Sequence, residues 1–166
     1  MTLAGIEERK GAMTSGEARD VWTAQENAME LLGALTLPGI ERSVPYVRLF
    51  LRDTFVPGYV APGDELLADM ALVVDELAAN GIRHTASGKG GKFTISLWAG
   101  RGVLRAEVTD DGANGARPVV RTVPEGESGR GLHIVGALAS RWGYRPEGAG
   151  TTVWAEFPVR GGRPQG

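Results

Sequence analysis

The segment "ELAANGIRHT" (residues 76–85) places three polar side chains at helical spacing. Glu76, Asn80 and His84 follow one another every four residues, so in a helix they lie on one side. Asp69 and Arg83 fall in the same stripe, and the opposite stripe is apolar. A carboxylate and an amide shielded from water need hydrogen-bonding partners, which a bound polar ligand would supply. Taken alone, the helix favours the simpler interpretation of a solvated face.

Two later segments could bind the parts of a nucleotide. In "VTDDG" (108–112), Asp110 ends an expected strand and could accept hydrogen bonds from an exocyclic amine, and Gly112 would let the backbone approach a flat ring. A simple Asp-Gly turn is the alternative. In "ESGRGLHIV" (127–135), Gly129 and Gly131 lead into an amphipathic helix, whose free N–H groups and dipole favour phosphate. A helix that merely starts at glycine remains open.

Neither segment follows a common nucleotide-binding fingerprint. A dinucleotide fingerprint would need a third glycine where Ile134 stands, and no Gly-Lys-Ser/Thr follows the glycines as in a Walker loop. A last segment, "GAGTTVWAEF" (148–157), is a loop that enters a strand. There Thr151 or Thr152 could point a hydroxyl into a site.

Hydrophobic periodicity predicts the elements that position these segments. We expect helices at 14–33, 41–55, from Asp64 to about Thr85, and at about 130–141. We expect strands at 34–39, 92–99, 102–110, 142–146 and 151–159. The sum is an α/β fold, an α+β two-layer sandwich with a mixed, largely antiparallel sheet and helices on one face. The expected division is an N-terminal helical extension (1–33), one domain (34–159) and a disordered tail (160–166).

Composition narrows the classes of function. The chain has 166 residues, 42% apolar and 23% charged, with a net charge of -2. That balance argues against general nucleic-acid binding. The absence of cysteine excludes disulfides and thiolate metal sites. No apolar run approaches a membrane span and no secretory signal is present, so we expect a cytoplasmic protein without membrane contact.

Taken in order, four segments resemble the motifs of the Bergerat-fold ATPases, the superfamily that includes gyrase and histidine kinases. They are "ELAANGIRH" (N box), "VTDDG" (first glycine box), "GRGLHIV" (second glycine box) and "GTTVW" (last box). Within that superfamily the chain resembles the small bacterial anti-sigma-factor serine/threonine kinases and related ATP-binding regulatory proteins. The resemblance covers about residues 35–158.

The resemblance implies ATP and Mg²⁺ as ligands and assigns a role to each motif. Asn80 would hold Mg²⁺ against the triphosphate, and Glu76 would act as general base. Asp110 would accept from the adenine amine, with Gly112 beside the ring. The remaining nucleotide-binding set would be Arg83, His84, Gly129, Arg130, Gly131, Leu132, His133, Thr151 and Thr152. For His84 a structural or phosphate-proximal role is favoured over catalysis.

Two positions depart from the family pattern. Asn114 takes the place of the second glycine in the first glycine box, and asparagine tolerates positive φ better than most residues. Gly81 stands inside the N-box helix, where it costs roughly 1 kcal/mol against alanine. We expect another part of the chain to pack closely there.

The resemblance implies a kinase that phosphorylates a serine of a STAS-type anti-anti-sigma factor, binds a sigma factor and so regulates transcription. An ATP-binding regulatory module that controls a partner through nucleotide occupancy, without phosphotransfer, is the alternative. A histidine-kinase fragment ranks lower, because no phospho-acceptor hairpin precedes the domain and the expected first helix has no histidine. Homodimerisation stays open.

Overall fold

The computed structural model describes residues 29–100, 102–112 and 128–159. Residues 14–28 of the expected helix 14–33, the loop that carries Asn114 and the expected tail at 160–166 lie outside these residues.

The described strands form one sheet in the order β1-β2-β3-β5-β4. They are β1 (Glu30–Pro38), β2 (Lys92–Gly100), β3 (Val103–Asp110), β4 (Arg141–Glu147) and β5 (Gly150–Pro158). All four pairings are antiparallel, so the expected largely antiparallel sheet is confirmed, without the parallel pair that a mixed sheet would contain. β2 and β3 form the expected hairpin, with Gly100 opposite Val103. β5 lies between β3 and β4, which brings the last motif beside the first glycine box.

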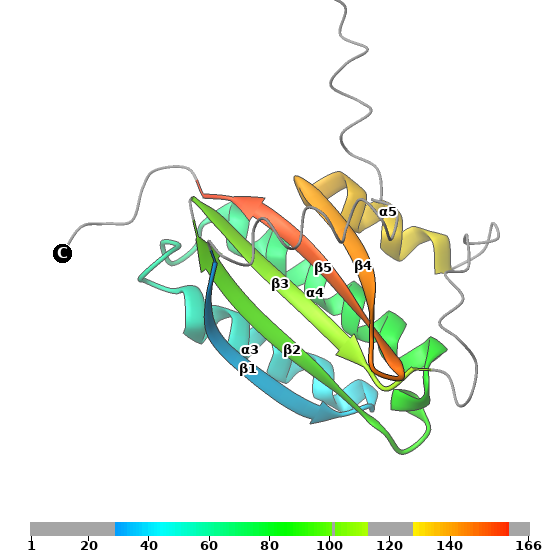
Figure 1. Ribbon diagram of the computed structural model, residues 1–166. Helices are drawn as coiled ribbons and strands as arrows, with labels where there is room; N and C mark the ends of the chain where they lie inside the picture. The colour runs from blue at the N-terminus through cyan, green and yellow to red at the C-terminus, as the bar shows by residue number, and fades with distance from the viewer. Residues whose placement is uncertain (1–28, 101, 113–127, 160–166) are drawn as a thin grey trace, which may run out of the picture.

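The helices cover one face of this sheet. They are α3 (Val44–Phe55), α4 (Glu65–His84) and α5 (Ser128–Leu138), with short 3-10 turns η1 (Glu41–Ser43) and η2 (Ala86–Gly88). In Figure 1, α3 and α4 lie behind the sheet. α4 packs on β2, β3 and β5, and α5 packs on α4 and β4. The expected two-layer arrangement is therefore confirmed.

Local signals explain where two of the helices begin. The Asp64 side chain accepts a hydrogen bond from the Leu66 N–H at 2.9 Å, so it caps α4 as an N-cap residue. Pro45 stands in the first turn of α3, where its missing N–H costs nothing. The start of α4 agrees with the expectation from the sequence, whereas α3 begins at Val44, after the 3-10 turn η1 that opens the expected helix 41–55.

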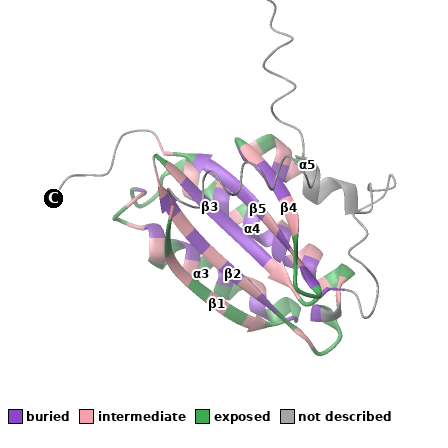
Figure 2. Cartoon of the chain, in the orientation of Figure 1, coloured by how far each residue is buried: buried purple, intermediate pink, exposed green. Residues whose placement is uncertain are grey.

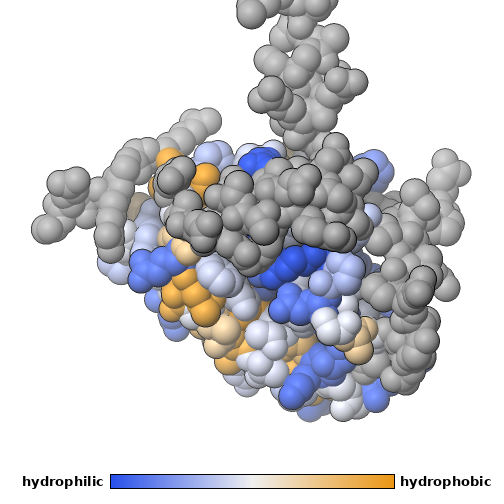
Figure 3. Space-filling model, viewed as in Figure 1, coloured by the Kyte–Doolittle hydropathy of each residue, from blue (hydrophilic) through white to orange (hydrophobic). Residues whose placement is uncertain are grey.

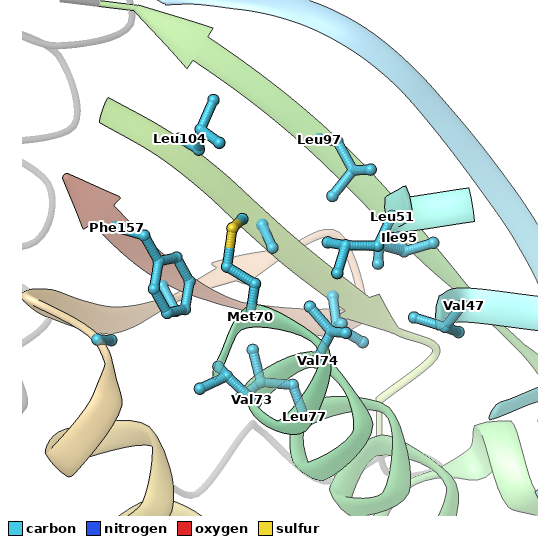
Figure 4. Close-up of a cluster of buried hydrophobic side chains, with 14 of the residues drawn as sticks. Val47, Leu51, Met70, Val73, Val74, Leu77, Ile95, Leu97, Leu104 and Phe157 are labelled. Carbon is cyan, nitrogen blue, oxygen red and sulfur yellow. The ribbon is translucent and has the colours of Figure 1, made fainter. Parts of the chain in front are cut away.

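The core lies between α4 and the sheet. The apolar side chains that alternate along β2 and β3 are buried: Phe93, Ile95, Leu97, Leu104, Ala106 and Val108. From α4 the buried side chains include Met70, Val74, Leu77 and Ala78, as the helical period predicted. Figure 4 shows Met70 reaching from α4 toward the sheet, with Leu104 and Phe157 on the strand side. This packing fixes the rotation of α4, and with it the side on which the N box lies.

The first strand begins earlier than the sequence indicated. Residues 30–33, expected at the end of a helix, belong to β1 and pair with β2. The register shifts between Leu31 and Gly33, so a β-bulge breaks the alternation of the strand and hides its period. Leu31 is 47% exposed, whereas Leu32 packs against the core. Figure 3 shows the molecule from the side of the sheet opposite α3 and α4, and apolar residues there include a group at the lower left, over the β1 and β2 edge.

The second face of the sheet, opposite the helices, carries charged side chains that are also buried. Arg105, Glu107 and Glu156 are between 1% and 3% exposed, and purple runs along β3 and β5 in Figure 2. The Arg105 Nε donates to Glu156 Oε1 at 3.0 Å, and its guanidinium lies 4.8 Å from the centre of the Trp154 ring. Burial raises the pKa of Glu107, which Arg145 and Arg105 partly offset. The buried charges on this face are therefore tolerated because each one is paired with an opposite charge.

One glycine makes room for that arrangement. A Cβ on Gly143 in β4 would lie 2.8 Å from Cζ2 of Trp154, a ring that is only 1% exposed. By contrast, a Cβ on Gly81 in α4 would meet Asp110 Cβ at 3.6 Å, an ordinary contact. Asp110 is thus the neighbour that we expected beside Gly81, although it leaves space for a methyl group.

We predict opposite effects of alanine at these two glycines. Gly143→Ala should lower the free energy of unfolding by about 1–3 kcal/mol, because the buried Trp154 ring has no room to shift. Gly81→Ala should raise it by up to about 1 kcal/mol, because alanine is the better helix former and the added methyl fits. Urea denaturation of both variants measures the two changes. Equal changes in the free energy of unfolding would contradict the explanation given for each glycine.

Candidate nucleotide-binding site

The N-box stripe of α4 faces partly toward solvent. Glu76 and Asn80 are half-buried, and Arg83 and His84 are exposed at the end of the helix. The Glu76 side chain makes no hydrogen bond or ion pair with any other described residue. Its carboxylate is thus available to a proton donor, and one turn later the Asn80 amide is available to a ligand.

The carboxylate of Asp110, at the end of β3, is held by two main-chain donors. Its Oδ1 accepts from the Gly112 N–H at 2.7 Å and from the Thr151 N–H at 3.2 Å. Burial raises the pKa of Asp110, and these two hydrogen bonds lower it in part. Oδ2 has no hydrogen-bond partner among the residues described. One oxygen is therefore fixed by the protein, and the other can accept from a ligand.

The first glycine box and the last box interlock through their backbones. A Cβ on Gly112, where φ is +76°, would lie 1.9 Å from the Ala149 carbonyl oxygen. A Cβ on Gly150 would lie 1.8 Å from the Asp110 carbonyl oxygen. Glycine is needed at both positions because the two chains approach each other so closely. The protein's own backbone therefore requires Gly112, in addition to the role beside a ring that the resemblance implies.

The sheet separates the two candidate threonines. Thr152 Oγ1 donates to Glu147 Oε2 at 2.8 Å and bonds Thr109 Oγ1 at 2.6 Å. Thr109 precedes Asp110, and successive side chains of a strand point to opposite faces. Thr152 therefore points to the second face, and it is fully buried. Thr151, whose N–H bonds Asp110, lies on the helix-covered face and is the better candidate for a ligand contact.

Contacts between elements bring the motifs to one end of the sheet. Gly81, next to Asn80, lies against the Asp110 side chain. In Figure 1 the arrowhead of β3 and the β4–β5 turn meet at the same end of the sheet. The N box, the first glycine box and the last box are therefore neighbours in space.

The second glycine box opens α5, which packs on α4 and β4. Its helix begins at Ser128, earlier than the expected start near 130. Gly129, Arg130 and Gly131 thus lie in the first turn, where backbone N–H groups have no acceptor within the helix. Such N–H groups, with the helix dipole, suit a phosphate. The side chains of residues 128–132 are not described, and His133 is exposed.

Two buried groups near the site were missed by sequence reasoning. Asp75, next to Glu76, is 8% exposed and forms an ion pair with Arg48 of α3. Ser87, after α4, is fully buried and hydrogen-bonds Lys92 of β2 and Asp111, the residue that follows β3. No periodic signal marks either residue, because each partner comes from a different element.

The donor set suits a metal ion shared with a ligand. The described residues contain no cluster of three or more His, Cys, Asp or Glu side chains that could hold a metal ion. An amide such as that of Asn80 can add one oxygen to an ion already bound to phosphates, which is how proteins commonly hold Mg²⁺. Of the helices described, none is long and apolar enough to cross a membrane.

Comparison with known proteins agrees with this geometry. The family described as histidine kinase-like ATPase domain matches residues 40–157, which include all four motifs. No curated protein matches the chain. The crystal structure of the RsbU and RsbW domains of Rv1364c from Mycobacterium tuberculosis is similar, with 20% identity and a TM-score of 0.55. That likeness spans 79% of this chain and 33% of the other, and at this identity it shows a shared fold. The chain belongs to the histidine kinase-like ATPase domain family.

Proposed function

We propose that this protein binds ATP with Mg²⁺ at the end of the sheet and transfers the γ-phosphoryl group to a serine of a protein partner. Family membership gives ATP as the nucleotide. The observation that carries the proposal is the position of Asp110, bonded to the last box through the Thr151 N–H and facing the N-box helix at Gly81. Motifs that lie far apart in the sequence thus meet around one free carboxylate oxygen.

Each group in this arrangement has a chemical task. Oδ2 of Asp110 accepts a hydrogen bond from the adenine amine, and the first-turn N–H groups of α5 hold phosphate oxygens. Asn80 contributes an oxygen ligand to Mg²⁺, which when bound neutralises charge on the phosphates. Glu76 takes the proton of the serine hydroxyl as that oxygen bonds the γ-phosphorus and the bond to ADP breaks.

The half-buried Glu76 favours a kinase over a module that only binds ATP. It lies one helical turn before Asn80 and has no partner among the described residues. A carboxylate kept unpaired beside the metal-binding amide suits a general base. We propose a STAS-type anti-anti-sigma factor as the phosphate acceptor and a sigma factor as a second partner, on the strength of the motif resemblance. We place this activity in the cytoplasm.

Asp110→Asn tests recognition of the base. Because both backbone donors bond Oδ1, the asparagine oxygen can keep them, and its NH₂ then replaces Oδ2. ATP affinity should fall about tenfold or more, since a hydrogen bond to a charged group is worth about 1.5–3 kcal/mol. GTP affinity should change less, because the oxygen on its ring accepts hydrogen bonds. Calorimetry with both nucleotides checks this, and equal losses would mean that Asp110 does not read the base.

The raised pKa of Asp110 predicts that both the stability of the protein and its ATP affinity depend on pH. Burial places the pKa of Asp110 above its ordinary value of 3.8. Native protein thus binds this proton more tightly than unfolded chain, so its contribution to stability is present below pH 3.8 and is lost as pH rises through the raised pKa. ATP affinity should follow the opposite trend and weaken as pH falls through that pKa, because the ionised oxygen is the better acceptor. The Asp110→Asn variant should lose this dependence.

Phosphotransfer itself is tested with radiolabelled ATP and candidate STAS-type proteins. The wild-type chain should label a serine of one candidate. Glu76→Ala should bind ATP with similar affinity but transfer at least about a hundredfold more slowly, whereas Asn80→Ala should lose Mg²⁺-dependent ATP binding with an unchanged circular dichroism spectrum. Tight binding without transfer by the wild-type chain to any candidate would favour the regulatory module.

A further inference from the structure

A single buried hydroxyl ties the end of the N-box helix to the end of β3. Ser87 Oγ donates to the Lys92 carbonyl at 2.7 Å and accepts from the Asp111 N–H at 3.0 Å. The Ser87 N–H donates to Thr85 Oγ1 at 3.1 Å, and that hydroxyl donates to the Gly81 carbonyl in the last turn of α4. Three segments are therefore joined in one hydrogen-bonded unit, which we call the Ser87 clasp.

The clasp holds the peptide that joins Asp110 to Asp111. On one side Ser87 Oγ bonds the N–H of this peptide. On the other side its carbonyl oxygen lies against Gly150, where a Cβ would approach to 1.8 Å. The Asp111 side chain adds a third restraint, because its Oδ2 accepts from the Lys92 N–H at 2.7 Å. This peptide cannot rotate without breaking its hydrogen bond to the hydroxyl of the buried Ser87.

We propose that Ser87 is a positioning residue for recognition of the base. By fixing the peptide that carries Asp110, it holds the free carboxylate oxygen at one position, where it meets the exocyclic amine of the nucleotide. This inference rests on the proposed binding of ATP. Ser87 acts through Asp111 and Asp110. A recognition group that is loosened by a fraction of an ångström loses selectivity before it loses all binding.

Loss of the hydroxyl has a specific consequence. Without it, the Asp111 N–H and the Lys92 carbonyl lose their shared partner, and the peptide next to Asp110 becomes free to rotate. The first turn of α5, which we assign to the phosphates, is not part of the Ser87 clasp. Removal should therefore weaken discrimination between bases more than it weakens binding of the triphosphate.

The experiment compares Ser87→Ala with Ser43→Ala in the full chain. Ser43 is a matched control, since it is 4% exposed and its Oγ donates to the Pro38 carbonyl at 2.7 Å, but it does not touch β3. By calorimetry, Ser87→Ala should reduce ATP affinity roughly tenfold and GTP affinity less than about threefold. Ser43→Ala should lower the melting temperature and leave the ratio of the two affinities unchanged.

A second readout needs no nucleotide. Carboxyl NMR of the free protein follows the titration of Asp110. In Ser87→Ala its pKa should move toward the ordinary value, because water reaches the loosened peptide. In Ser43→Ala the pKa of Asp110 should stay raised. Should Ser87→Ala fail to fold, Ser87→Cys keeps most of the side-chain volume with weaker hydrogen bonds and should show a partial effect on both readouts.

The possible results separate this inference from the proposed function. If Ser87→Ala leaves the ratio of ATP affinity to GTP affinity unchanged, the role of Ser87 in base recognition is overturned. An unchanged Asp110 titration would likewise show that Ser87 does not position Asp110. If the wild-type chain binds no ATP, the proposed function fails, and the NMR titration still decides whether Ser87 positions Asp110.

Discussion

The whole site depends on one carboxylate oxygen that joins two loops. Oδ1 of Asp110 accepts from the N–H groups of Gly112 and Thr151, and so it fastens the end of β3 to the start of β5. The fastening works only because Gly112 and Gly150 let the two backbones touch. It also leaves the second oxygen of the carboxylate for a ligand. One side chain thus both joins β3 to β5 at this end of the sheet and offers an oxygen that can bind a ligand.

The two faces of the sheet have different roles. The helix-covered face supplies Asp110, Thr151 and the N-box helix, and so it carries the site. The second face holds the buried pairs of Arg105 with Glu156 and of Arg145 with Glu107, and the Thr152 hydroxyl belongs to this face. Buried charges of this kind add little net stability but strongly disfavour any arrangement that leaves one unpaired. They therefore favour one register between β3, β4 and β5, the strands whose ends form the site.

The sequence predicted the elements with strong periodicity and the motifs carried on them. The apolar stripe of α4 gave the correct buried side of that helix, and the order of the four boxes gave the correct family. It failed at β1, where a bulge at Leu31 and Gly33 breaks the period that identifies a strand. It also could not choose between Thr151 and Thr152, because that choice depends on strand pairing. Ser87 and Asp75 were missed for a similar reason, since their partners are distant in the chain.

The way in which Asp110 is held has a consequence for divergence among proteins of this fold. Its protein partners are main-chain N–H groups, which every amino acid except proline supplies. Mutation can therefore replace most neighbouring side chains without removing a donor. Next to Asp110, however, a larger residue does not fit at Gly112 or Gly150, where two backbones touch. We expect the side chains around this carboxylate to vary widely among homologues, while the two glycines are kept. The backbone arrangement would then be shared even by proteins with low sequence identity.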